Sequence, residues 1–347
     1  MGLTGSGEID GEKLCRRSYG NSRRSLRERN VSTSLQSVSS ANETTTWDDG
    51  FPPSIRCMMT HVIKTATQNL IRVFKCLEES FTMSPPRTST TLLVELCAGG
   101  INDVQLAAKF AVDRIELNCG MAVGGLTPSA GLVAAARRSF SGPIVSMVRP
   151  REAGFAYSDA EFIQMIDDCE FLLAAGLDGI AIGCLNADGT IDVQRCRTLR
   201  RLFPTATLVF HKAFDVTPNL PLAAQQLIDC GFSRILTSGG CVTAFEGRSM
   251  IRQLISLCGK QIEFVVGGGV RAQNLESIVR ETGCDQIHSA VRSIMPDAST
   301  ANNPALDFGG FADGQNRGYG AADETQLQDL MAAVEGLSGR DRSGYAQ

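Results

Sequence analysis

Acidic and sulfur-bearing side chains end two short apolar runs in the second part of the sequence. Glu95 and Cys97 end the run TLLVELC, and Glu116 and Asn118 end the run RIELN. A pair of carboxylates suits acid–base catalysis because mutual repulsion separates their pKa values. A cysteine thiolate is a preferred ligand of soft metal ions. These positions therefore predict acid–base or metal chemistry.

Basic and imidazole side chains mark three further runs. Arg149 follows PIVSMV, His211 follows TLVF, and His288 lies within QIHS. Arginine holds an anionic substrate through two parallel hydrogen bonds, and histidine exchanges protons near neutral pH. Lys212 has the opposite strand parity to His211, so a Schiff base at Lys212 is not expected.

Structural roles remain open for the same side chains. Glu95, Glu116 and Arg149 also fit a buried ion network that closes the fold without doing chemistry. His288 also fits a core histidine whose ring is bonded to the backbone.

Glycine-rich turns follow two of the later runs. Gly239 and Gly240 follow RILTS, and Gly267, Gly268 and Gly269 follow EFVV. The exposed N–H groups of such turns bind phosphate groups. The same glycines also suit a tight turn into the next helix. Gly239, Gly267, Gly268 and Gly269 are therefore candidates for a phosphate cradle.

A repeated unit connects these runs. Four segments share the order of a helix end, a polar residue and an apolar strand: FAVDRIEL (110–117), AGLDGIAI (175–182), CGFSRILT (230–237) and TGCDQIHS (282–289). Gly176, Gly231 and Gly283 lie where the end of a helix requires a left-handed backbone conformation. Each segment is therefore interpreted as a junction from a helix to a strand.

The whole pattern predicts alternating strands and helices. Strands are predicted at 92–97, 114–118, 144–149, 179–183, 207–211, 234–238, 262–266 and 285–289. Helices are predicted at 102–111, 128–140, 158–175, 192–203, 219–230, 246–258, 271–282 and 324–335. Ser158 and Glu161 predict a capping box at the start of the third helix.

An α/β fold, the (β/α)8 or TIM barrel, accommodates this pattern. Residues 91–347 supply 257 residues for eight units, close to the roughly 250 typical of this barrel. A doubly wound open sheet is the alternative, but the first strand runs into ELCAGG rather than a G-x-G-x-x-G turn. Because the C-terminal ends of barrel strands form the functional face, the residues above are expected to meet at one mouth.

Residues 1–90 are predicted to be a low-complexity extension before the barrel. Residues 1 to about 50 are rich in Ser, Thr, Asn, Gly and Arg and carry little apolar surface, which predicts disorder. Residues 55–77 form a basic, amphipathic segment that targets an organelle, binds a surface as a helix or packs as a helix on the following domain. The stretch SPPRTSTT (84–91) is typical of a linker.

The net charge argues against nucleic-acid binding. Residues 1–90 hold 12 Lys and Arg and 9 Asp and Glu, a net +3. The rest of the chain holds the remaining 21 basic and 28 acidic residues, a net −7. A nucleic-acid-binding module is expected to be basic, and the longer part of the chain is acidic. Separately, no apolar run approaches the length that spans a bilayer. Neither nucleic acid nor membrane is therefore an expected partner.

The twelve cysteines are widely spaced. The closest two, Cys230 and Cys241, are eleven residues apart, so no C-x-x-C zinc or redox motif is present. Most lie in apolar helical stretches, where a reduced cysteine packs as a small hydrophobe. With no secretory leader recognised, the cysteines predict a reducing, cytoplasmic compartment.

A series of short motifs resembles the CutC copper homeostasis family, in order and at consistent intervals. The motifs are VELCAGG, DRIELNCG, GGLTPS, MVRPRE, FAYSD, GIAIGCL, DGTID, FHKAFD, RILTSGG, VGGGV and QIHSAVRS. They extend over about residues 92–340. The resemblance implies a TIM barrel that is cytoplasmic, binds copper and forms a homo-oligomer.

The resemblance also implies a position for Cu(I). In the family pattern one cysteine ends the first strand and a second follows the Glu-Leu of the second strand. This sequence has Cys97 at the first position, but it has Asn118 at the second and Cys119 one residue later. A one-residue step reverses the face of a strand, so Cys119 is expected to point away from Cys97 unless the chain has already left the strand. Cys97 and Cys119, with Met121 nearby, are the candidate metal ligands.

Three functions follow from these expectations. The first is copper homeostasis through Cu(I) binding near Cys97. The alternative is an enzyme acting on a small anionic or phosphorylated metabolite, with Glu95 and Glu116 as acid and base, Arg149 as anion clamp and His211 as the second proton-transfer group. The third is a scaffold whose mouth residues are structural.

Overall fold

The computed structural model describes residues 92–300, 302–303, 306, 311–313 and 316–338. The predictions for residues 1–90, namely a disordered stretch, an amphipathic segment and a linker, lie outside the described residues. The division of the chain into an extension and a barrel at residue 91 therefore stays a prediction.

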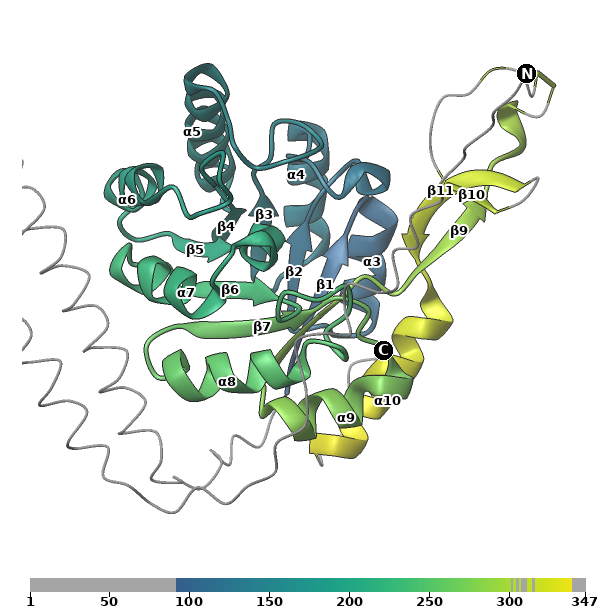
Figure 1. The fold of residues 1–347 in the computed structure, drawn as a ribbon. Helices are drawn as coiled ribbons and strands as arrows, with labels where there is room; N and C mark the ends of the chain where they lie inside the picture. The colour runs from purple at the N-terminus through teal and green to yellow at the C-terminus, as the bar shows by residue number, and fades with distance from the viewer. Residues whose placement is uncertain (1–91, 301, 304–305, 307–310, 314–315, 339–347) are drawn as a thin grey trace, which may run out of the picture. The chain divides into compact units, whose positions relative to one another are not determined.

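Eight parallel strands close into a barrel (Figure 1). They are β1 (Leu93–Ala98), β2 (Arg114–Leu117), β3 (Ile144–Met147), β4 (Gly179–Ile182), β5 (Thr207–Phe210), β6 (Arg234–Thr237), β7 (Glu263–Gly267) and β8 (Gln286–Ser289). Each strand pairs with the next, and β8 returns to pair with β1. The predicted TIM barrel is confirmed, and each strand ends within two residues of its predicted bounds.

Helices surround the barrel on its outside (Figure 1). They are α3 (Ile101–Lys109), α4 (Ala130–Ser139), α5 (Asp159–Ala174), α6 (Val193–Leu202), α7 (Leu220–Asp229), α8 (Arg248–Cys258), α9 (Ala272–Thr282) and α10 (Glu324–Ser338). No helix in the described part of the chain is long and apolar enough to cross a membrane.

Local signals set the ends of these helices as predicted. Ser158 and Glu161 form the capping box that begins α5. Gly176, Gly231 and Gly283 have positive φ angles of 84°, 77° and 73° and follow α5, α7 and α9. Only a residue without a Cβ adopts this conformation without strain, so these glycines turn the chain back toward the sheet.

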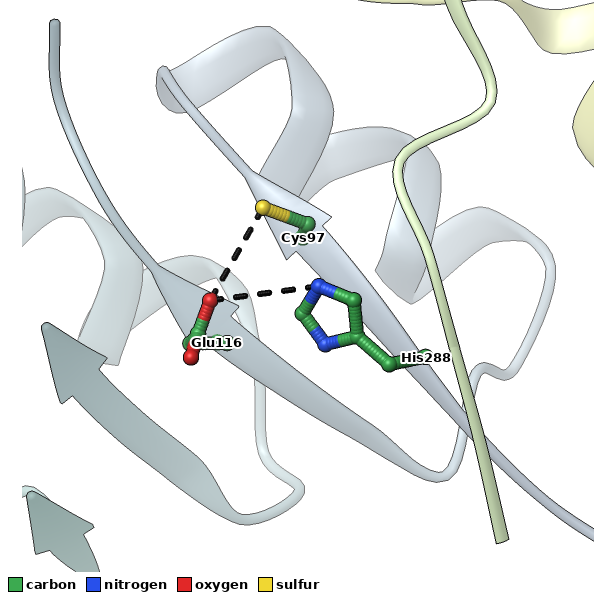
Figure 2. Close-up of side chains that lie close together, drawn as sticks. All are labelled: Cys97, Glu116 and His288. Carbon is green, nitrogen blue, oxygen red and sulfur yellow. Dashed lines mark hydrogen bonds and ion pairs between the residues drawn. The ribbon is translucent and has the colours of Figure 1, made fainter. Parts of the chain in front are cut away.

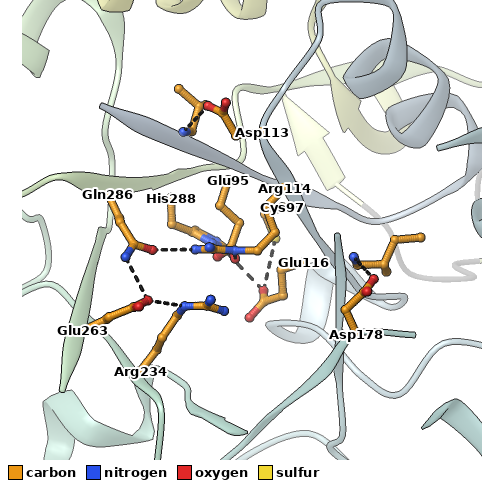
Figure 3. Close-up of polar contacts among 12 residues, drawn as sticks. Glu95, Cys97, Asp113, Arg114, Glu116, Asp178, Arg234, Glu263, Gln286 and His288 are labelled. Carbon is orange, nitrogen blue, oxygen red and sulfur yellow. Dashed lines mark hydrogen bonds and ion pairs between the residues drawn. The ribbon is translucent and has the colours of Figure 1, made fainter. Parts of the chain in front are cut away.

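The interior of the barrel is apolar on one side and polar on the other. Strands β3 to β7 contribute an apolar cluster separate from the main core: Val145, Ala181, Val209, Leu236 and Val265. Strands β8, β1 and β2 instead contribute polar side chains, most of them buried (Figure 3): Glu95, Cys97, Arg114, Glu116, Gln286 and His288. The alternate residues Leu96 and Ile115 belong to the core under the helices.

A small antiparallel sheet follows β8 and was not predicted. Its strands are β9 (Arg292–Pro296), β10 (Phe311–Asp313) and β11 (Asn316–Ala322), in the order β10–β11–β9. Arg292 Nη2 lies 3.3 Å from the carbonyl oxygen of Cys97 and 3.3 Å from Asp103 Oδ2. Asp103 Oδ1 accepts a hydrogen bond from the N–H of Ala322 at 2.9 Å. The sheet therefore braces the end of β1.

Candidate functional site

A cavity of about 260 Å³ lies at the C-terminal ends of the barrel strands. It brings together six of the predicted site residues: Cys97, Glu116, Arg149, His211, Gly268 and Gly269. The other four predicted residues, Glu95, Cys119, Gly239 and Gly267, are not among the residues that line it. Since the lining residues come from β1, β2, β3, β5, β6, β7 and β8 or the turns after them, barrel closure creates the cavity.

Cys97, Glu116 and His288 form a compact cluster in one wall of this cavity (Figure 2). A ligand atom from each of the three lies within 4.8 Å of the other two. The Cys97 thiol donates to Glu116 Oε2 at 3.8 Å, and His288 Nε2 lies 3.9 Å from the same oxygen. Sulfur, imidazole and carboxylate are all metal ligands in proteins, so this donor set can hold a metal ion.

Asn118 occupies the position where the CutC pattern has its second cysteine. Its Nδ2 donates to Glu116 Oε2 at 3.0 Å and to Cys97 Sγ at 3.6 Å. The side chain of Asn118 therefore points into the cluster, as the strand parity predicts. It contributes a hydrogen-bond donor there instead of a second thiolate.

Glu95 lies directly beneath the cluster and fixes the ring of His288. Its Oε1 is 2.8 Å from His288 Nδ1, and its Oε2 accepts a hydrogen bond from Arg114 Nε. Burial alone would raise the pKa of Glu95, but the hydrogen bond with His288 and the charge of Arg114 lower it to about 2. Glu95 is therefore a permanent anion at neutral pH and holds His288 with Nε2 toward Glu116.

Burial and neighbouring charges set the protonation of the cluster itself. Burial alone would lower the pKa of His288, but contacts with Cys97, Glu95 and Glu116 raise it well above 6.5. Burial raises the pKa of the Cys97 thiol, and the charge of Glu116 adds to this rise. Burial also raises the pKa of Glu116, helped by the charge of Glu95. Cys97, Glu116 and His288 therefore each hold a proton more tightly than the same side chain in water.

A hydrogen-bonded seam continues from Glu95 toward the opposite end of the barrel (Figure 3). Arg114 Nη2 donates to Gln286 Oε1 at 2.9 Å, and Gln286 Nε2 donates to Glu263 Oε2 at 2.9 Å. Glu263 also pairs with Arg234 at 2.6 Å. The sequence analysis considered a buried ion network of Glu95, Glu116 and Arg149. In the structure Glu95 pairs with Arg114, and neither Glu116 nor Arg149 takes part in the seam.

Arg149 is buried in the cavity wall and holds loops together. Its Nη1 donates to the carbonyl oxygens of Val123 and Gly125, each at 2.9 Å, and its Nη2 donates to that of Ala153 at 2.7 Å. The guanidinium also lies over the ring of Phe155, 5.2 Å from its centre. These contacts place a positive charge at the cavity with much of its donor capacity already used.

His211 is buried and uncharged. Burial, with the nearby charge of Arg149, lowers its pKa to about 3. Its Nδ1 accepts a hydrogen bond from the N–H of Ala213 at 3.1 Å, so the neutral ring carries its proton on Nε2. Nε2 has no hydrogen-bond partner among the described residues. A ring with so low a pKa does not serve as a base near neutral pH.

Cys119 lies outside the cluster. Its thiol donates to the carbonyl oxygen of Thr127 at 3.0 Å, and its backbone forms an isolated bridge with Leu126. This arrangement agrees with the parity argument that directs Cys119 away from Cys97. Met121, by contrast, lines the cavity.

The glycines divide between the cavity and the turns. Gly268 and Gly269 line the cavity, with φ angles of 111° and 70°. Gly239 forms a tight turn, since its N–H donates to Thr237 Oγ1 at 2.8 Å and its Cα packs against Gly247. Gly267 packs against Leu236 and His288 beneath the cavity.

Three polar residues had no assigned role in the sequence analysis. His288 was noted without a ligand role, and Arg114 and Arg271 were not identified. Barrel closure is the signal that could have identified His288. A closed barrel pairs β8 with β1 and so places His288 opposite Glu95. Arg114 is likewise the direct neighbour of Glu95 on β2.

Comparisons with known proteins agree with the motif resemblance. The family model described as the CutC family matches residues 92–293. A CutC family protein from Treponema denticola is 41% identical over 217 residues, covering 62% of this chain and 88% of the relative. The human copper homeostasis protein cutC homolog is 31% identical over 245 residues, covering 71% and 90%. A CutC crystal structure from Streptococcus agalactiae is 34% identical with a TM-score of 0.55, covering 57% of this chain and 98% of that one.

Proposed function

The chain belongs to the CutC family, and on this premise we propose that it acts in copper homeostasis by binding Cu(I) at the barrel mouth. The observation that carries the proposal is the cluster of Cys97, Glu116 and His288 in the cavity wall. Cu(I) is soft and prefers sulfur and imidazole ligands. Cys97 Sγ and His288 Nε2 are therefore the proposed ligands, with Glu116 beside them.

The surroundings of His288 support a ligand role. A metal-binding histidine usually donates its second ring N–H to a carboxylate, which fixes the ring and raises its basicity. Glu95 Oε1 at 2.8 Å from Nδ1 supplies this contact. Because the pKa values of Cys97 and His288 are both raised, Cu(I) must displace protons from them, and its affinity is expected to rise with pH.

Asn118 makes the proposed site a one-thiolate site. Its amide donates to Cys97 Sγ at 3.6 Å, a contact that favours the thiolate over the thiol. Met121 offers a second sulfur. Its side chain packs against Gly99, two residues after Cys97, since a Cβ added at Gly99 would lie 2.5 Å from Met121 Cγ. Cys119, a candidate ligand from the sequence, makes no contact with the cluster and is not among the proposed ligands.

An anaerobic Cu(I) titration against a competing chelator tests this proposal. We expect Cys97→Ala and His288→Gln each to weaken Cu(I) binding by at least about tenfold, the effect of disturbing even the surroundings of a metal ligand. Cys119→Ala is the matched control and is expected to bind Cu(I) like the wild type. Wild-type Cu(I) affinity in a folded Cys97→Ala variant would contradict the proposal. A loss of Cu(I) affinity confined to Cys119→Ala would identify Cys119 as the ligand instead.

The geometry favours this function over the acid–base enzyme. Glu95 does not line the cavity, and its low pKa removes it as a general acid near neutral pH. His211, the second proton-transfer candidate, stays neutral. Glu116 retains a raised pKa and cavity access, so it is the one member of the proposed acid–base set that fits the role.

Two properties implied by the family resemblance stay predictions. They are the cytoplasmic location and the assembly into a homo-oligomer. Sedimentation of the full chain measures the second directly.

A further inference from the structure

The wall of the cavity carries an excess of positive charge. Arg149, Lys212, Arg271 and His288 all line it. Among the described residues that line the cavity, Glu116 is the single carboxylate. The chain as a whole has a net charge of −4, so the sign of the charge is locally reversed at the mouth.

Two of the four cations already have anionic partners. His288 pairs with Glu95 at 2.8 Å, and Lys212 Nζ lies 3.0 Å from Asp215 Oδ2. Asp215 is itself fixed by donors that include the Ser238 N–H at 2.9 Å and the Gly240 N–H at 3.0 Å. The Lys212–Asp215 pair is neutral overall, and Glu95 is shared between His288 and Arg114, so these contacts do not account for the excess.

Arg149 and Arg271 have no carboxylate partner within the described part of the chain. The Arg149 guanidinium contacts three carbonyl oxygens, and Arg271 Nη1 contacts the carbonyl oxygen of Val270 and Ser289 Oγ. The residue Arg149 is only 6% exposed, and its Nε has no hydrogen-bond partner among the described residues. Carbonyl oxygens satisfy N–H groups but do not neutralise a charge, and an uncompensated buried charge is costly.

The turn after β7 adds backbone donors on the same side. Neither Gly268 nor Gly269 donates its N–H to a backbone or side-chain acceptor among the described residues, and both have positive φ angles. Successive free N–H groups in such a turn form an anion-binding concavity. Lys212 Nζ lies beside this turn, 3.4 Å from where a Cβ of Gly268 would be.

We propose that this side of the cavity binds the phosphate group of a small molecule, or inorganic phosphate, between the Gly268–Gly269 turn, Lys212 and Arg271. Arg149 supplies a second uncompensated charge in the same wall. Phosphate matches the site because it offers several acceptor oxygens and two negative charges to a surface composed of donors. The cavity volume of about 260 Å³ restricts the ligand to a small one.

The phosphate site is distinct from the proposed copper site in its residues. Cys97, Glu116 and His288 lie on β1, β2 and β8, whereas the phosphate donors follow β5 and β7. Phosphate binding is therefore expected in copper-free protein and in the Cys97→Ala variant, so failure of one proposal leaves the other intact.

Isothermal titration calorimetry of the copper-free full chain tests the inference. The probes are inorganic phosphate and glycerol 3-phosphate, with uncharged glycerol as the negative control. We expect both phosphates to bind with one site per chain, and binding of inorganic phosphate alone would identify the free ion as the ligand. Arg271→Gln and Lys212→Gln are each expected to weaken binding by about tenfold or more, the usual scale for a charge-assisted hydrogen bond.

Arg280→Gln is the matched control, because Arg280 lies on α9 with its side chain 72% exposed and paired with Glu276. It is expected to bind phosphate like the wild type. The inference is overturned if neither phosphate binds the wild type at millimolar concentration. It is also overturned if Arg280→Gln loses as much affinity as folded Arg271→Gln and Lys212→Gln, since binding would then follow net charge alone.

Discussion

Glu95 determines the electrostatics of the barrel interior. One of its oxygens contacts His288 and the other contacts Arg114, and its side chain is only 4% exposed. A buried carboxylate with two such partners remains ionised and orients both of them. Glu95 is therefore a positioning residue for the ring of His288.

Replacing this carboxylate should change how stability depends on pH. We expect Glu95→Gln to cost about 3–5 kcal/mol at pH 7, the range for removing one partner of a buried ion pair. The pKa of Glu95 is lowered from 4.5 to about 2, so its stabilisation is complete above pH 4.5 and is lost as the pH falls toward 2. Urea unfolding at a series of pH values should show that the difference in unfolding free energy between variant and wild type narrows below pH 4.5.

Glu276→Gln is the control for this series, because the Glu276 side chain is 62% exposed. It is expected to change the unfolding free energy by no more than about 0.5 kcal/mol. If the difference in unfolding free energy between Glu95→Gln and the wild type stays constant between pH 4.5 and pH 3, the role of Glu95 as a stabilising anion is contradicted.

Single residues of the site differ in how well the sequence predicts them. Cys97 and Glu116 were placed at the mouth because each ends a recognisable strand, and strand parity also gave the direction of Cys119. The link between His288 and Glu95 was missed, because it depends on the pairing of the first strand with the last. Arg149 was predicted to bind an anionic substrate. Its contacts with three carbonyl oxygens were not predicted, because they depend on loop conformations that the sequence pattern does not encode.

Among the elements, the regular units of the barrel were predictable and the appended sheet was not. Each strand is a short apolar run, and several follow a glycine that ends a helix, so two local signals agree. Strand β11 lacks such signals, since NRGYGAA (316–322) contains two glycines and little alternation. Pairing between β9 and β11, rather than local propensity, forms this sheet.

Gly183, directly after β4, provides the space for His211. A Cβ at this position would lie 2.7 Å from His211 Nδ1 and 2.8 Å from the Cβ of Ala213. We expect Gly183→Ala to lower the unfolding free energy by about 1–3 kcal/mol, since overpacking forces side chains from their rotamers. Thermal or urea unfolding of the variant measures this loss.

Gly154→Ala serves as the matched control, because a Cβ there would meet nothing within 4 Å. It is expected to match the wild type or to be slightly more stable. Equal stability of Gly183→Ala and Gly154→Ala would show that the ring of His211 moves aside freely.

At the scale of the whole barrel, the polar seam links strands across the closure of the barrel and favours one strand register. It joins five strands through Arg234, Glu263, Gln286, Arg114 and Glu95. An apolar cluster from β3 to β7 also lies in the interior, so β6 and β7 contribute to both the seam and the apolar cluster. A satisfied polar network favours one register, because a shifted strand would leave its buried members Glu95, Arg114 and Gln286 unpaired.

Gln286 is the central link of this seam and allows a test of closure. It accepts from Arg114 and donates to Glu263, so Gln286→Ala leaves both without this partner. We expect a loss of about 1–3 kcal/mol in the free energy of unfolding, mainly because the buried Nη2 of Arg114 loses its acceptor. Urea unfolding followed by circular dichroism measures it. Gln261→Ala, at an exposed position, should be neutral, and equal losses in both variants would argue against the seam.

The return of β8 to β1 also fixes when the proposed copper site can exist. His288 comes 191 residues after Cys97, and Arg292, which holds the carbonyl oxygen of Cys97, comes later still. Chains are synthesised from the N-terminus, so a growing polypeptide displays the thiol and the carboxylate long before the imidazole. The cluster is assembled only after translation has passed β8. Copper capture by the proposed site is therefore expected of the finished protein and not of the nascent chain on the ribosome.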